Sequence, residues 1–141
     1  MNVFEIPGVA LRGVAAAVPE TEFSNADYDM LSDKEKRLLI KTTGVERKRV
    51  AKKGVTTSDY CLLAAEKLLD ELNWKKEDIG VLIFLSQSRD YYLPATSIIL
   101  QDRMGLPRSC IAFDVSLGCS GYVYGLSIIS SMMKSVGRKK G

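Results

Sequence analysis

The sequence predicts an α/β fold built on a mostly parallel sheet. From Thr57 onward, segments with helical spacing of apolar residues alternate with short apolar runs that are typical of strands. The clearest run, residues 80–86, is apolar on both faces, as expected of a parallel strand covered by helices. The chain has 141 residues, 46% of them hydrophobic, which is enough for a core. We therefore expect residues 1–141 to form one domain.

The N-terminal third predicts a strand, two short helices and an extended segment. Residues 9–18 are apolar apart from one arginine and end at a proline, which indicates a first strand entering the core. Polar residues at 24–27 and 32–35 offer caps for two short helices. Gly44 stops the second helix, and residues 45–50 look extended.

Two further helices follow. Thr57 or Ser58 caps the first, in which apolar residues recur at spacings of three and four: Cys61, Leu62, Ala65, Leu68, Leu69 and Leu72. Pro94 suits the first turn of the second helix, and Gly105 followed by Pro107 ends it.

The stretch from Cys110 to Met133 carries the candidate chemistry. Residues 110–115 predict a buried strand, residues 116–121 a turn, and the uncharged segment after them a buried helix. Cys119 lies at this strand-to-helix turn, where unpaired N–H groups and the helix dipole favour a thiolate able to attack a carbonyl or thioester. Its own N–H could serve as an oxyanion donor. The same pattern also suits a small, buried packing residue.

Gly118 and Gly121 flank this cysteine. Two glycines are expected where a tight turn needs permissive backbone angles and where a substrate must approach the backbone closely.

Charge and cysteine content exclude several classes of protein. A net charge of +3 is too small to indicate nucleic acid binding, and the basic cluster at residues 47–53 is interpreted as a solvated strand face. No apolar run reaches membrane-spanning length and no signal peptide is evident, so we expect a cytoplasmic protein without membrane contact. Three cysteines without C-x-x-C spacing indicate free thiols. We expect no metal and no cofactor, and the chain contains no histidine to pair with a nucleophile.

Residues 112–126, AFDVSLGCSGYVYGL, resemble the active-site signature of the β-ketoacyl-acyl carrier protein synthase III family, in which a nucleophilic cysteine sits in a similar motif. Four more segments resemble family motifs in the same order: residues 18–27, 41–50, 80–86 and 91–106. The resemblance implies a thiolase-like fold in which Cys119 accepts an acyl group from acyl-coenzyme A or acyl carrier protein. The enzyme would then condense this group with malonyl-acyl carrier protein in fatty-acid or related biosynthesis, as a homodimer.

The resemblance also suggests three substrate-binding positions. Counting back from Gly44, Leu38 and Thr42 stand where bacterial members typically have a tryptophan and an arginine that hold the adenine end of coenzyme A. Coenzyme A would then bind differently or not be the donor, or the chain is an ordinary member that has drifted. Leu93 matches a position whose side chain reaches into the neighbouring subunit's acyl pocket, although it also suits a plain interface or core residue.

The chain also departs from the family pattern. A strand after the Cys119 helix and a later histidine and asparagine are missing, so we expect an N-terminal portion that is incomplete at its C-terminal end and inactive in full turnover. Exposed apolar surface should then cause aggregation or tight association. The alternative is a non-catalytic thiolase-fold scaffold or partner chain.

Overall fold

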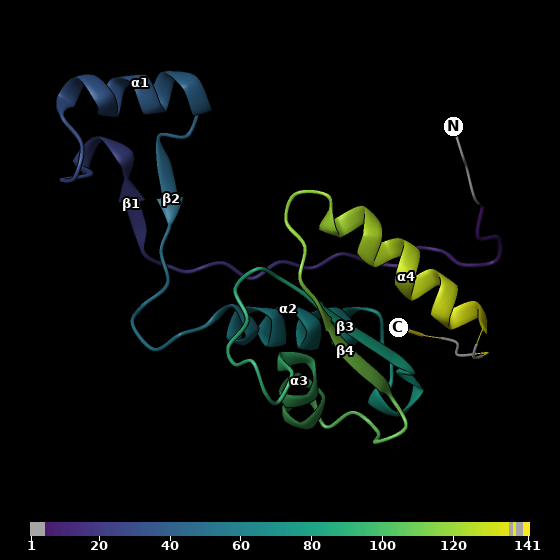
Figure 1. Cartoon of the computed structure of the whole chain (residues 1–141). Helices are drawn as coiled ribbons and strands as arrows, with labels where there is room; N and C mark the ends of the chain where they lie inside the picture. Colours follow the sequence, from purple (N-terminus) through teal and green to yellow (C-terminus); the bar gives the residue numbers. More distant parts are fainter. Residues whose placement is uncertain (1–4, 136, 138–139) are drawn as a thin grey trace. The chain divides into compact units, whose positions relative to one another are not determined.

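The computed structural model describes residues 5–135, 137 and 140–141. The chain divides into two compact units, which are described separately. The larger unit comprises Met1–Ala16 and Thr57–Gly141, and the smaller unit comprises Ala17–Thr56 (Figure 1).

The larger unit is an α/β structure around a parallel pair of strands. Its elements are, in order, α2 (Thr57–Glu71), the short 3-10 helix η2 (Lys76–Asp78), β3 (Val81–Leu85), α3 (Thr96–Met104), β4 (Ile111–Val115) and α4 (Gly121–Ser135). Strands β3 and β4 pair in parallel from Val81↔Ile111 to Leu85↔Val115. Helix α3 makes the crossover between them, so the predicted parallel α/β architecture is confirmed.

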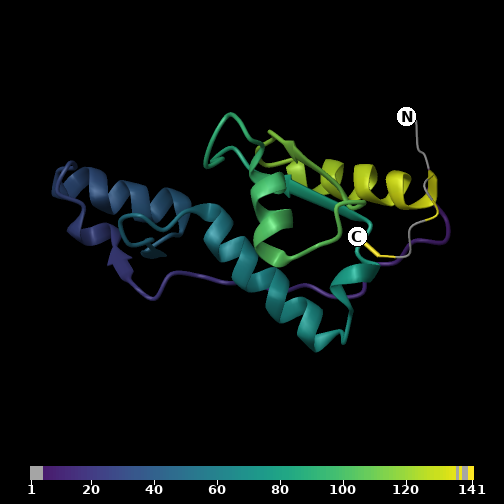
Figure 2. The ribbon, with the colours of Figure 1, turned by 90° about the horizontal axis from the view of Figure 1, so that it is seen from below.

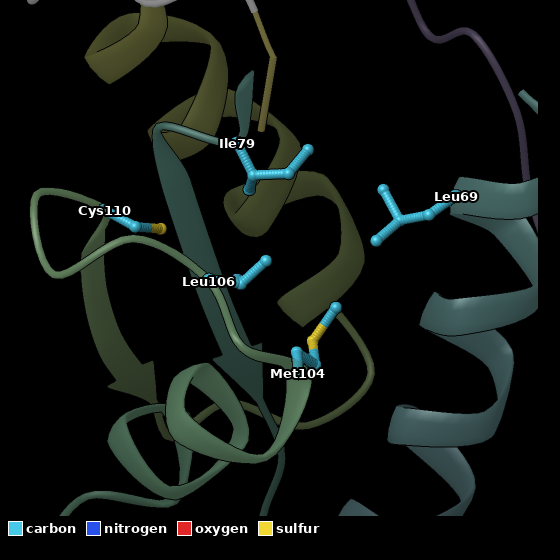
Figure 3. Packing of buried hydrophobic residues seen from close by; sticks show 5 residues of the cluster. All are labelled: Leu69, Ile79, Met104, Leu106 and Cys110. Atoms are coloured by element: carbon cyan, nitrogen blue, oxygen red, sulfur yellow. The ribbon is translucent and has the colours of Figure 1, made fainter. Parts of the chain in front are cut away.

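Alternate side chains of β3 face different helices. Leu82 packs against a buried cluster on one side of the sheet, whereas Ile83 and Leu85 lie beside α4 on the other. The cluster contains Leu69, Ile79, Met104, Leu106 and Cys110, which converge in Figure 3. Figure 2 shows α4 on one side of the strand pair and α2 and α3 on the other. The helical spacing predicted for α2 is confirmed, because Leu62, Ala65 and Leu69 all face this cluster.

The smaller unit contains β1 (Glu22–Ser24), the 3-10 helix η1 (Asn25–Asp27), α1 (Asp33–Thr43) and β2 (Arg47–Arg49). Strands β1 and β2 are antiparallel. Helix α1 begins with a capping box between Ser32 and Glu35 and ends at Gly44, whose φ of 70° is left-handed. Strand β2 is fully exposed, and Arg47 pairs with Glu22 at 3.0 Å, which agrees with a solvated basic face.

The strand expected at residues 9–18 is wrong. The described chain is extended there, and alternate residues from 13 to 19 are partly buried, but no strand is assigned. Each described strand pairs elsewhere, β1 with β2 and β3 with β4, and an extended segment becomes a strand only when a neighbour completes its hydrogen bonds. Gly13 instead packs closely on α2, where a Cβ would lie 2.8 Å from Leu68 Cδ1.

The expectation that the helix after Cys119 is buried is also wrong for the described chain. Only Gly121 of α4 is buried, and Tyr122 and Val123 are 62% and 66% exposed. Strand β3 packs on one face of the helix, and the Lys134 ammonium donates to the Pro7 carbonyl oxygen at 3.0 Å, but the apolar side chains of its first turn remain exposed. Within the described part of the chain, no helix is long and apolar enough to cross a membrane.

Candidate active site around Cys119

Cys119 is exposed in the loop of residues 116–120 that joins β4 to α4, called the cysteine turn below. The Gly121 N–H donates to the Gly118 carbonyl oxygen at 2.8 Å, which closes the turn. The Tyr124 N–H donates to the Ser120 carbonyl oxygen at 3.2 Å, the first bond of the helix. The predicted strand, turn and helix are therefore confirmed, with Cys119 two residues before the helix begins.

Gly121 allows α4 to approach β3. A Cβ on Gly121 would lie 2.4 Å from Leu85 Cδ2, and one on Gly125 would lie 3.0 Å from Leu85 Cδ1. Neither Gly118 nor Gly121 has a positive φ, so the expected need for permissive backbone angles is not the reason for these glycines. The contact with Leu85 instead holds the start of α4 against the end of β3.

Asp114 connects β4 to the start of α3. Its Oδ2 accepts a hydrogen bond from the Thr96 N–H at 2.9 Å, and its Oδ1 accepts one from the Ser97 N–H at 2.8 Å. Burial pushes the pKa of Asp114 upward, but the hydrogen bonds from Ser97 and Thr96 outweigh it and hold the pKa below its ordinary value. The carboxylate thus caps α3 and fixes the strand that leads into the cysteine turn.

A second set of polar contacts holds the loop between β3 and α3. The Ser58 hydroxyl donates to Asp90 Oδ2, and the Asp90 N–H donates to Thr96 Oγ1 at 3.3 Å. Ser58 and Thr96 are completely buried. Because α2, this loop and α3 share these bonds, the loop is anchored at Asp90, near its middle.

A pocket of about 470 Å³ opens beside the cysteine. Its lining comes from β3, the cysteine turn and one face of α4: Ile83, Leu85, Gly118, Cys119, Tyr122, Gly125, Leu126 and Ile129. Most of these side chains are apolar, and an exposed thiol stands among them. Such a surface suits the hydrocarbon part of an acyl group bonded to Cys119.

The other two cysteines differ from Cys119, and all three are free. Cys110 is buried in the core cluster. Cys61 is exposed on α2, but its thiol is partly covered by neighbouring atoms. This burial raises the pKa of the thiol, and the negative charge of Asp90 raises it further. The prediction of free thiols is confirmed. Among the described residues, no group of three or more histidine, cysteine or acidic side chains could hold a metal ion.

The three positions suggested for substrate binding lie on two different parts of the chain. Leu93 is 87% exposed in the loop before α3 and is not among the residues that line the pocket. A core role for Leu93 is therefore wrong, whereas an interface role remains a prediction. Leu38, 60% exposed, and Thr42 lie one turn apart on α1 in the smaller unit.

For two residues near the cysteine turn, Asp114 and Gln87, the sequence predicted no functional role. Asp114 was part of the recognised motif, and Gln87 simply followed the β3 run. The Gln87 carboxamide lies against Gly118. Both contacts join segments distant in sequence, so local patterns give no indication of them.

Comparisons with known proteins agree with this geometry. No family model matches the chain. The β-ketoacyl-[acyl-carrier-protein] synthase III of Syntrophomonas wolfei is 31% identical over 132 residues, which are 94% of this chain and 40% of that protein. The synthase III of Sulfurovum is 33% identical over 93% of this chain and 38% of its own length. The chain corresponds to the N-terminal portion of the β-ketoacyl-[acyl-carrier-protein] synthase III family.

Solved structures support the same assignment and the thiolase-like fold. A 3-oxoacyl-(acyl-carrier protein) synthase from Burkholderia xenovorans superposes with a TM-score of 0.83 at 39% identity, over 87% of this chain and 36% of that one. Cerulenin-bound OleA from Xanthomonas campestris gives a TM-score of 0.79 at 29% identity, over 89% and 40%. The chain thus spans about 40% of the length of the relatives it matches.

Proposed function

We propose that this chain is the N-terminal part of an acyltransferase of the 3-oxoacyl-[acyl-carrier-protein] synthase III type. The observation that carries the proposal is the exposed Cys119 thiol, at the β4–α4 turn and beside a mostly apolar pocket. Relatives named as synthase III cover nearly the whole chain, which supports this chemistry. In the complete enzyme the acyl group on Cys119 would be condensed with malonyl-acyl carrier protein in fatty-acid or related biosynthesis.

In the loading step, Cys119 Sγ attacks the carbonyl carbon of an acyl thioester and forms a new carbon–sulfur bond. The carbonyl electrons move to oxygen, and their return expels the thiolate of the donor, which takes up a proton. The Cys119 N–H is our candidate donor to the transient oxyanion. The acyl chain would lie against Ile83 and Leu126 in the pocket.

Donor, partner and location are further parts of the proposal. Acyl-coenzyme A or acyl carrier protein would supply the acyl group, and Leu38 and Thr42 would contact the donor. A homodimer would form with Leu93 at its interface, because Tyr91, Tyr92 and Leu93 make an exposed apolar group. We place the protein in the cytoplasm and treat residues 1–141 as one thiolase-like domain.

The proposal predicts that Cys119 becomes acylated. After incubation with acetyl- or longer acyl-coenzyme A, intact-mass spectrometry should show a gain of one acyl group in the wild type and none in Cys119→Ala. Cys61→Ser is the matched control, since Cys61 is also exposed but its thiol has a raised pKa. A gain that persists in Cys119→Ala would show that the nucleophile assignment is wrong.

The exposed apolar faces of α4 favour one alternative, a non-catalytic chain that pairs with another thiolase-fold chain. Tyr122, Val123 and Tyr124 are all exposed there, and such a surface is typical of an interface. The same mass experiment bears on both functions. If neither wild type nor Cys61→Ser gains an acyl group from any donor, this portion of the enzyme does not load an acyl group by itself, and loading by the isolated chain is overturned.

A further inference from the structure

Gln87 lies at the same sheet edge as the cysteine turn. Strands β3 and β4 are parallel, so the segments that follow them leave the sheet at the same edge. The Ser86 N–H donates to the Val115 carbonyl oxygen at 3.1 Å, which extends the pairing one residue beyond β3. Gln87 is the next residue, and it is therefore held beside residues 116–120.

The Gln87 carboxamide lies flat over Gly118. A Cβ built on Gly118 would be 3.2 Å from Gln87 Nε2, 3.2 Å from Oε1 and 3.3 Å from Cδ. Three nearly equal distances place this point over the face of the amide plane. The hydrogen-bonding edges of the amide are therefore directed past Gly118, and Gly118 permits the approach because it has no side chain.

The amide remains available for a ligand. Gln87 is exposed, and within the described structure its carboxamide forms no hydrogen bond. Gly118, which it covers, is bonded directly to Cys119, and both residues line the pocket. Gln87 itself is not among the residues that line the pocket, but its polar amide lies against Gly118, the lining residue next to the thiol-bearing Cys119.

We propose that the Gln87 side-chain amide donates a hydrogen bond to the carbonyl oxygen of a group that Cys119 attacks. As sulfur bonds to the carbonyl carbon, the displaced electron pair develops on this oxygen, and an amide donor beside it lowers the barrier. The inference rests on the proposed function in one respect, that Cys119 is the acyl acceptor. It makes Gln87 a catalytic residue in addition to the Cys119 N–H.

The test compares two thiol reagents and needs no acyl donor, so it stays informative even if acyl loading fails. When a thiolate adds to the carbon–carbon double bond of N-ethylmaleimide, enolate charge develops on a carbonyl oxygen of the ring. Methyl methanethiosulfonate transfers a methylthio group and contains no carbonyl. Second-order rates with Cys119 are measured by mass spectrometry for both reagents, in a Cys61→Ser background.

Gln87→Leu should lower the maleimide rate about tenfold and leave the methanethiosulfonate rate within about twofold of the wild type. The tenfold loss is smaller than the loss of about two to three orders of magnitude that is typical of removing a preorganised oxyanion donor. Gln87→Glu, which cannot donate when ionised, should lower it at least as far. Ser88→Ala is the control, because its exposed side chain neighbours Gln87 without covering Gly118.

The outcomes separate a donor from a packing role. Equal losses with both reagents would show that Gln87 only shapes the cysteine turn, and unchanged rates would show that it has no role; either result overturns the proposal. Gly118→Ala gives an independent check, since its Cβ would lie 3.2 Å from the amide and would push it slightly away. It should cause a smaller loss than Gln87→Leu that is again selective for maleimide, and a nonselective loss would count against the proposal.

Discussion

Gly121→Ala is expected to lower the free energy of unfolding of the larger unit by about 1–2 kcal/mol, although alanine is the better helix former. The new Cβ would lie 2.4 Å from Leu85 Cδ2 and 3.3 Å from Leu117 Cβ, so either Leu85 or the start of α4 must move. Overpacking of this kind typically costs about 1–3 kcal/mol. The gain in helix propensity offsets at most about 1 kcal/mol of this.

Gly125→Ala is the matched control on the same helix and against the same leucine. Its Cβ would lie 3.0 Å from Leu85 Cδ1 and would meet no other atom within 4 Å, so a much smaller adjustment than at Gly121 can relieve it. Urea unfolding should show little change or a slight gain in stability for this variant. In a Leu85→Ala background, Gly121→Ala should lose most of its cost. An equal cost in both backgrounds would show that Leu85 is not the cause.

Local features of the fold could be predicted from the sequence because their causes are local. Ser32, Glu35 and Gly44 mark the ends of α1 through backbone hydrogen bonds and a left-handed turn, and each is visible within a few residues. The parallel pairing of β3 followed from a run that is apolar on both faces. The position of Cys119 followed from a short strand, a glycine-rich turn and a long apolar helix.

Nonlocal features could not be predicted in the same way. Residues 9–18 have the composition of a strand, but composition does not supply the neighbour that completes its hydrogen bonds. The apolar character of α4 indicated burial without indicating what covers it. The contact of Gln87 with Gly118 depends on the register of β3 and β4, which brings together residues that are 31 positions apart, from 87 to 118.

Asp114→Ala is expected to destabilise the larger unit by about 2–4 kcal/mol. The substitution removes a charged acceptor from two backbone N–H groups, those of Thr96 and Ser97, at a site where both residues are completely buried. Hydrogen bonds to a charged group contribute about 1.5–3 kcal/mol each, and a buried donor left without a partner adds its desolvation cost. Asp114→Asn should recover only part of the loss, since its amide oxygen can accept one of the two hydrogen bonds but its amide nitrogen cannot accept the other.

The pH dependence of stability distinguishes this capping role from simple packing. The pKa of Asp114 in the folded chain is held below its ordinary value, so the ionised form is favoured by folding. Its contribution is therefore fully present above the unfolded-state pKa of about 3.9 and is lost as pH falls through the lower, folded-state pKa. Thermal unfolding followed from pH 6 downward should show this loss in the wild type, and Asp114→Asn should show a shallower slope below about pH 4. Parallel slopes in the two proteins would mean that the carboxylate charge does not hold α3, and that Asp114 supports the cysteine turn through its shape alone.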